Sequence, residues 1–201
     1  VKDHVKYGAS SSSRSTLTPA FFVNVYPFES KLLAVKAFAK KSFRMPTFND
    51  LYYADMGNSK LNPESALQYD LGFVLNKDWK QGIVDHFRLQ VDGYYNTVYD
   101  KIVAYPKGQQ FRWTMLNLGK VHIKGVEAMA EVGLEPAKDW KVTARLQYTY
   151  QDARDVTDPN TSYYKDQIPY IPWHRGAAIL GLSWRELDLA YSFIYSGERY
   201  S

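Results

Sequence analysis

The stretch at 140–151, "WKVTARLQYTYQ", decides the fold because its residues alternate without a break between apolar and polar side chains. Every second residue from Trp140 to Tyr150 is apolar, and the residues between them are lysine, threonine, arginine and glutamine. A β-strand turns successive side chains to opposite faces. The stretch therefore predicts a strand with one apolar and one polar face.

The same alternation recurs along the chain. It is found at 67–75, 87–91, 126–134 and 187–195, and weaker strands are expected around 20–28, 31–43 and 174–184. Short connections at 27–30, 76–82, 135–139 and 184–187 alternate with long polar ones at 44–63, about 100–112 and about 152–172. In an up-and-down antiparallel sheet, alternate connections emerge at the same edge. The order predicts an all-β antiparallel sheet of about eight strands, with tight turns at one edge and long loops at the other.

Two kinds of β protein share this pattern. The strands look longer than the ~5–6 residues usual in soluble sheets and match the ~9–11 residues that cross a bilayer at a tilt. Trp140 at one end of its strand, and Tyr148 and Tyr150 at the other, resemble the aromatic girdles at membrane interfaces. These features favour a transmembrane β-barrel in contact with outer-membrane lipid. A soluble ligand-carrying β-barrel and a complete small outer-membrane barrel, acting as an adhesin or anchor, are the alternatives.

The composition limits the function. Among 201 residues there is no cysteine, and the 25 basic and 21 acidic residues are interspersed rather than segregated, which disfavours a nucleic-acid partner. No apolar run approaches the ~18 residues of a membrane helix. The four histidines are far apart in the sequence, so no metal site is expected. Motifs for catalytic nucleophiles and phosphate-binding loops are absent, and we expect neither an enzyme nor a cofactor.

The long loops carry aromatic and hydrogen-bonding side chains suited to recognition. The first, within "FRMPTFNDLYYADMGNSKLNPES" at 43–65, also holds proline and glycine as backbone constraints. For any single residue, packing of the loop on itself is an equally good interpretation. The ligand-contact candidates are Tyr52, Tyr53 and Asp55 on the first loop, Tyr105, Gln109 and Arg112 on the second, and Tyr163, Tyr164 and Tyr170 on the third.

Several stretches resemble one known family. "FRMPTFNDLYY" followed by "GNSKLNPES" is similar to the paired signature, FRAP then NPNL, of the barrels of TonB-dependent outer-membrane receptors. Downstream, "NLGKVHIKGVEAMAEV" and "LQYTYQDARD" resemble two successive strands of those receptors, in the same order and spacing. The resemblance covers about residues 20 to 200.

The resemblance implies a function and a location. Such receptors are 22-stranded barrels in the cell outer membrane, closed by a plug domain. They import scarce ligands with energy from the TonB complex of the inner membrane. On this interpretation, residues 1–201 are a partial barrel whose plug domain, TonB-contacting N-terminal segment and final strands are absent.

The resemblance also bears on the ligand and on the polar strand faces. Haem importers of the family carry a histidine between the halves of the paired signature, and none occurs at 44–65. We therefore expect an extracellular small ligand, cobalamin or a ferric siderophore. Charged mid-strand residues such as Arg145 and Glu131 are expected to point into the lumen and to contact the plug rather than the ligand.

Overall fold

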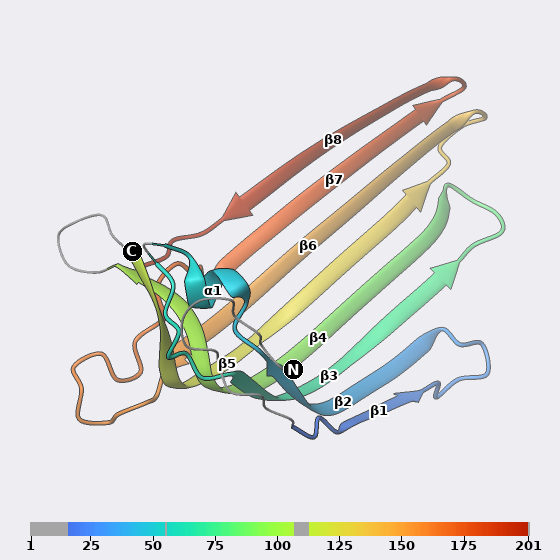
Figure 1. Cartoon of the computed structure of the whole chain (residues 1–201). Helices are drawn as coiled ribbons and strands as arrows, with labels where there is room; N and C mark the ends of the chain where they lie inside the picture. The colour runs from blue at the N-terminus through green and yellow to red at the C-terminus, as the bar shows by residue number, and fades with distance from the viewer. Residues whose placement is uncertain (1–15, 55, 107–112, 201) are drawn as a thin grey trace.

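Eight antiparallel strands form one sheet in the computed structural model, which describes residues 16–54, 56–106 and 113–200. The elements are β1 (Ala20–Val25), β2 (Leu33–Arg44), α1 (Phe48–Tyr52), β3 (Glu64–Asp78), β4 (Val84–Pro106), β5 (Trp113–Leu134), β6 (Trp140–Asp155), β7 (His174–Trp184) and β8 (Leu187–Ser196). The spatial order follows the chain from β1 to β8, as Figure 1 shows. The predicted up-and-down all-β fold is confirmed.

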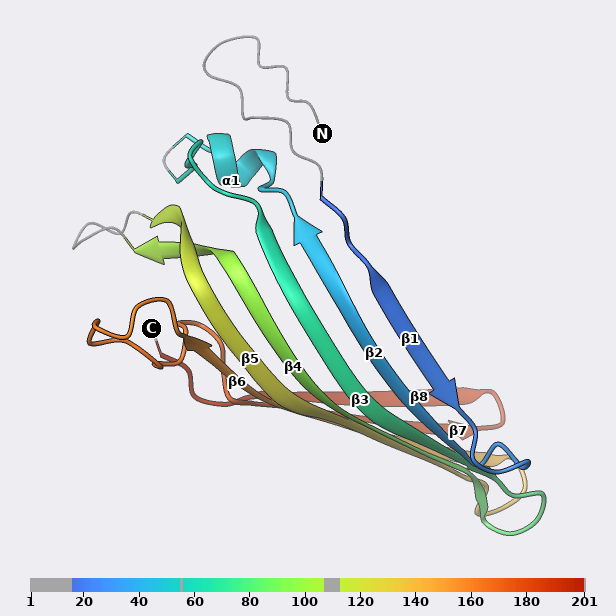
Figure 2. The same ribbon diagram turned by 90° about the horizontal axis from the view of Figure 1, so that it is seen from below.

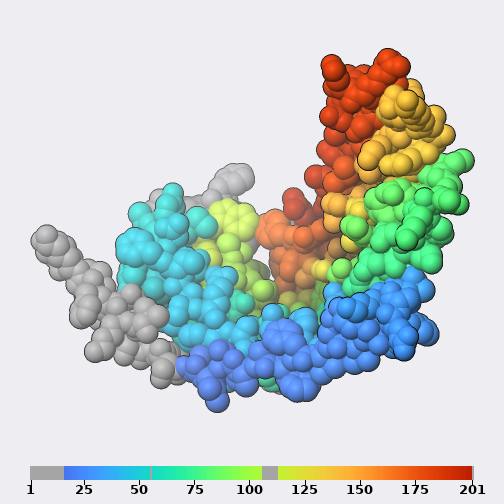
Figure 3. Space-filling view, turned by 90° about the vertical axis from the view of Figure 1, so that its right-hand side faces the viewer, coloured from blue at the N-terminus to red at the C-terminus, as the bar shows by residue number. Residues whose placement is uncertain are grey.

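The sheet is an open, curved wall. Seen from below in Figure 2, tight turns gather at one end of the strands, while α1 and the long connections gather at the other. Figure 3 shows the wall bending from blue β1 to red β8. Neither of these two strands pairs with the other, so each is an edge of the sheet. A complete eight-stranded barrel, which would need that pairing, does not form.

The two faces of the sheet differ in chemistry. We call the inner face the one that carries Arg145 on β6, and the outer face the one that carries Leu146. Register puts Arg145 opposite Glu131 and Leu146 opposite Ala130, so the alternation within each strand continues across the sheet. Leu146 is 57% exposed and Tyr148 46% exposed. The soluble-carrier alternative predicted that this apolar face is buried, and the exposure contradicts it.

Aromatic rings bound the apolar outer face at both ends. Trp140 stacks on Trp184 at the tight-turn end, with 5.5 Å between ring centroids. At the other end, Tyr150 packs on His174 at 5.3 Å. The distance from Trp140 to Tyr150 along the strand is roughly 33 Å at ~3.3 Å per residue, and a strand tilt of ~40° reduces its height to roughly 25 Å. This height matches the apolar band of an outer-membrane barrel.

Charges on the inner face are paired across strands. The Glu131 carboxylate accepts from Arg145 Nε at 2.6 Å and lies 3.2 Å from His86 Nε2 and 3.6 Å from Arg88 Nη1. The Lys36 ammonium lies 2.8 Å from a carboxylate oxygen of Asp92, a residue only 7% exposed. The Glu131 network joins the neighbouring strands β4, β5 and β6, and the Lys36–Asp92 pair joins β2 to β4 across β3. Their predicted contact with a plug domain stays a prediction.

Tight turns at one end rely on residues with positive φ. Asp139 (φ 65°) precedes β6, and Arg185 (φ 53°) lies in the two-residue turn between β7 and β8. The Arg185 amide donates to the Asp139 carbonyl at 3.2 Å, which links the two turns. A backbone with φ > 0 matches the right-handed twist of a hairpin.

Within the described residues, no helix is both long enough and apolar enough to span a membrane.

The second long loop is where the sequence-based prediction was wrong. The stretch at 100–112 was expected to be a long polar loop, but β4 continues to Pro106 and β5 begins at Trp113. Asp100 (φ 52°) bends β4, and its carbonyl accepts from Asn117 Nδ2 on β5 at 2.6 Å. At 101–106 and 113–118 the two extended strands satisfy each other's backbone groups, so the polar residues there lie in strands. Tyr105 is therefore a strand residue.

Candidate functional site

The first long loop packs on the inner face of the β4–β5 hairpin. Leu51 of α1 and Leu61 are buried against Ile102 of β4. Asn58 Nδ2 donates to the Met115 carbonyl at 3.0 Å, and the Met115 amide donates to the Met56 carbonyl at 2.9 Å. The loop is thus a folded structure attached to the hairpin.

Asparagines of the paired signature make these attachments. The Asn62 amide donates to Asn117 Oδ1 at 2.8 Å, and Asn117 Nδ2 donates back to the Asn62 carbonyl at 3.0 Å. Glu64 accepts from the Ile102 amide at 3.1 Å. The signature therefore acts here as a structural clasp between the first loop and the hairpin. The motif alone could not distinguish this role from ligand contact, since both use polar side chains.

The third long loop, at 156–173, also folds over the inner face. Ile168 is 3% exposed and packs in a cluster with Val98, Val121 and Ala153. Gln167, 6% exposed, accepts from the Ala153 amide at 2.8 Å and donates to the Ile171 carbonyl at 3.2 Å. Sequence reasoning missed Gln167. The only signal for this residue in the sequence was its polar side chain next to the apolar Ile168.

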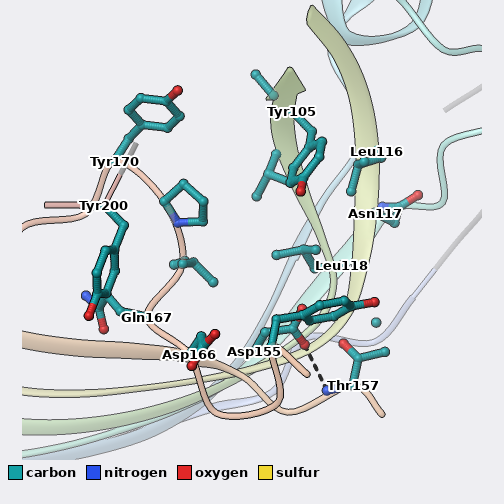
Figure 4. Close-up of a pocket in the computed structure, with 16 residues that line it drawn as sticks. Tyr105, Leu116, Asn117, Leu118, Asp155, Thr157, Asp166, Gln167, Tyr170 and Tyr200 are labelled. Carbon is teal, nitrogen blue, oxygen red and sulfur yellow. Dashed lines mark hydrogen bonds between the residues drawn. The ribbon is translucent and has the colours of Figure 1, made fainter. Parts of the chain in front are cut away.

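A pocket of about 760 Å³ lies between the third loop and the hairpin. Figure 4 shows Tyr105 projecting from the hairpin toward the pocket, across from Tyr170 and Tyr200. The polar lining also includes Tyr163, Asn117, Thr157, Gln167 and the carboxylates of Asp155 and Asp166, and the apolar lining includes Leu116, Leu118, Ile168 and Pro169. Its volume falls within the ~300–1,000 Å³ of small-molecule sites.

Contacts around the pocket hold its walls in place. The Tyr170 ring lies 5.4 Å from Trp113 of the hairpin, centroid to centroid, and its amide donates to the Tyr200 carbonyl at 2.9 Å. Asp155 Oδ1 accepts from the Thr157 amide at 2.8 Å, the bond drawn in Figure 4. Fixed π-faces, hydroxyls and carboxylates can bind a ligand that has both apolar and hydrogen-bonding surface.

Only some of the sequence-predicted candidates meet at this pocket. Tyr105, Tyr163 and Tyr170 line it. The other described candidates lie elsewhere: Tyr52 packs beside Phe48 and the Leu51 cluster, Tyr53 caps α1, and Tyr164 lies beneath Lys165. Asp55, Gln109 and Arg112 lie outside the described residues. Sequence reasoning also missed Asp155, Asp166 and Tyr200, because β6 and the loops meet only in the folded sheet.

The pocket has the makeup of a binding site. Throughout the part of the chain that the structure describes, no group of three or more histidine, aspartate or glutamate side chains could hold a metal ion.

Comparison with known proteins identifies the family. The model "TonB dependent receptor-like, beta-barrel" matches residues 1–201. This chain belongs to the TonB-dependent receptor β-barrel family.

Relatives of this TonB-dependent receptor barrel are transporters. The chain is 29% identical over 118 residues to a vitamin B12 transporter of Vibrio vulnificus, covering 58% of this chain and 17% of that protein. It is 29% identical over 133 residues to a vitamin B12 transporter of Photobacterium profundum, covering 61% of this chain and 19% of that protein. The chain thus spans less than a fifth of the length of either relative.

A solved structure supports the fold. The copper transporter OprC matches with a TM-score of 0.66 and 18% identity, over 90% of this chain and 26% of that one. At that identity the likeness concerns the fold alone. The family assignment and the fold of this TonB-dependent receptor barrel are therefore each supported by a separate comparison.

Proposed function

We propose that this chain is part of an energy-coupled transporter of the cell outer membrane that imports cobalamin or a ferric siderophore. The complete barrel would have 22 strands around a plug domain, and the TonB complex would supply energy through a segment outside this chain. The pocket between the hairpin and the third loop is the capture site on the external side. The tyrosine-rich pocket at the long-loop end is the observation that carries this proposal.

Cobalamin is the first ligand to test. The matched relatives are vitamin B12 transporters. A corrinoid presents a large apolar ring system edged by amides, and the pocket offers tyrosine rings and hydroxyls beside two carboxylates, Asp155 and Asp166. Ferric siderophores use similar aromatic contacts and are the second class to test.

The test uses the full-length protein in cells that lack their own cobalamin receptor. Tyr105→Ala combined with Tyr170→Ala should weaken surface binding of labelled cobalamin roughly 100-fold, because buried aromatic contacts each contribute on the order of 10-fold. Tyr53→Ala is the matched control, since Tyr53 is 59% exposed and lies outside the pocket. Collapse of the proton gradient should stop uptake and leave binding intact. Failure of the wild type to bind cobalamin or any ferric siderophore tested would reject the proposal.

A further inference from the structure

Cations gather on the outer face just beyond the aromatic ring at the long-loop end. The register puts Lys124 directly opposite Tyr95, and Lys120 opposite Tyr99, on the outer face. Arg154 lies on the same face, two residues beyond Asp152, which pairs with Lys124. We call Lys120, Lys124 and Arg154 the basic belt. It begins where the apolar band ends.

One buried carboxylate organises two members of the basic belt. Asp152 is 2% exposed, and it accepts from Arg154 Nε at 2.8 Å and lies 3.5 Å from Lys124 Nζ. The side chains of Lys124 and Arg154 nevertheless stay 63% and 48% exposed. Asp152 therefore holds the two cations side by side. Arg154 Nη1 also donates to the Lys165 carbonyl of the third loop at 3.3 Å, which fixes the guanidinium further. The Asp166 carboxylate also acts on Arg154, so three cations against two carboxylates leave a local excess of one positive charge.

The third cation is positioned by an aromatic ring. Lys120 Nζ lies 5.7 Å from the centroid of the Tyr99 ring, so its stem runs along the outer face. An ammonium above an aromatic ring keeps most of its charge available to an anion.

Cations at the tight-turn end are arranged differently. Lys141 Nζ lies 3.3 Å from Glu135, and Arg185 Nε lies 3.9 Å from Asp139. Each of these cations has its own exposed carboxylate, so the charges cancel. Lys31 and Lys77, also at the tight-turn end, lie over the rings of Tyr26 and Trp79. The feature that sets the long-loop end apart is therefore the pair of cations held together by one buried carboxylate.

We propose that the basic belt binds the phosphate groups of lipid headgroups in the outer leaflet. Tyrosines at membrane interfaces lie at headgroup level, and Tyr95 is opposite Lys124, which puts the belt at the height of lipid phosphates. Arginine and lysine donors match phosphate oxygens in charge and geometry. The inference rests on the membrane placement in the proposed function. It adds a lipid site on the outer face, beside the third loop whose residues line the ligand pocket.

The test measures lipid binding to the full-length protein by native mass spectrometry in mild detergent. Diphosphoryl lipid A is the probe, and its dephosphorylated form and inorganic phosphate are the comparisons. Lys124→Gln with Arg154→Gln should weaken lipid binding roughly 30-fold, about fivefold for each basic residue near an anionic headgroup. Lys141→Gln with Arg185→Gln makes the same change of charge at the opposite end and should bind like the wild type.

Further variants separate binding from folding. Lys124→Arg with Arg154→Lys keeps both charges and should retain binding, and Lys120→Gln alone, which leaves the Asp152 pairs intact, should weaken it about fivefold. Equal binding by the double glutamine variant and the wild type would overturn the inference. So would equal binding of dephosphorylated lipid, or displacement of the lipid by inorganic phosphate. If the inference alone fails, the protein still resides in the outer membrane and imports its ligand; if the proposed function fails, the wild type does neither.

Discussion

Asp50 shows how one carboxylate can order part of the first long loop. Asp50 Oδ2 accepts from the Thr47 amide at 2.8 Å, and the Asp50 amide donates to Thr47 Oγ1 at 3.1 Å, a reciprocal cap on α1. Arg44 Nη2 lies 3.0 Å from the same carboxylate oxygen. Partial burial acts to raise the pKa of Asp50, but the Thr47 bonds and the Arg44 charge outweigh it and hold the pKa below its ordinary value.

This cap makes the first loop sensitive to acid. A carboxylate with a lowered folded-state pKa stabilises fully above its unfolded pKa of ~4, and the stabilisation is lost as the pH falls through the folded value. Hydrogen exchange at the Leu51 amide, corrected for intrinsic rates, should therefore accelerate about fivefold in acid, since a cap contributes about 1 kcal/mol. In the Asp50→Asn variant, the Leu51 amide should exchange at every pH at the fast rate that the wild type shows in acid.

The control for this prediction is Glu29→Gln, which removes an exposed carboxylate in the turn between β1 and β2. It should keep the pH dependence of the wild type. If Asp50→Asn kept that dependence as well, another group would be responsible.

Single residues of the loops were the hardest part of the site to predict. Thr47 and Asp50 have the spacing of a helix cap, yet a five-residue helix leaves no apolar periodicity to accompany it. A helix cap at Asp50 was accordingly not predicted. Whether a tyrosine such as Tyr52 faces a ligand or a core depends on its partners, and those come from β4 and β5, far along the chain.

At the scale of elements, period-2 alternation located the strands because the two faces of a membrane sheet meet opposite environments. Its predictive value ends where the strands leave the apolar band. The hairpin formed by Lys101–Pro106 and Trp113–Leu118 pairs regularly but carries mixed side chains on both faces, so it was expected as a loop. Inner-face packing by Ile168 was likewise hidden, because Pro169 and Pro172 break any regular alternation around it.

Ile168 should hold the third loop in place without supporting the sheet. Its side chain is buried among Val98, Val121 and Ala153, and its amide donates to the Ala153 carbonyl at 2.9 Å. Ile168→Ala should destabilise the closed loop by ~2–5 kcal/mol. An external protease acting on intact cells should then cut the loop at least roughly 30-fold faster.

Ile194→Ala is the matched control, because Ile194 on β8 is 80% exposed. Its cleavage rate should equal that of the wild type, and both variants should accumulate normally in the outer membrane. Unchanged cleavage of the Ile168 variant would mean that other contacts hold the loop. Loss of that variant from the membrane would mean that Ile168 stabilises the whole barrel.

At the scale of the whole molecule, the two ends of the strands differ in loop length, packing and charge. Clasped loops and the basic belt with its buried carboxylate lie at one end, and short turns with exposed ion pairs at the other. The sequence alone predicted the difference in loop length, since it depends only on the order of connections. The packing could not be predicted, because it joins residues such as Asn62 and Asn117 that only the pairing of strands brings together.

This asymmetry predicts which end faces the exterior. Lys60→Cys on the first loop and Lys138→Cys in a tight turn are exposed positions that make the same chemical change in a chain without cysteine. Gly57 on the same loop is unsuitable, because a Cβ there would lie 2.6 Å from the Tyr53 amide nitrogen and 2.7 Å from that of Tyr52. A maleimide too bulky to cross the outer membrane should label the Lys60 variant alone in intact cells, and both variants once the membrane is opened. Labelling of the Lys138 variant alone would show that the barrel has the opposite orientation. Labelling of neither variant in intact cells, but of both after lysis without detergent, would show that the protein is not in the membrane. Because clasped loops and the basic belt share one end, the expected result would also put the ligand pocket and the proposed lipid site on the external side.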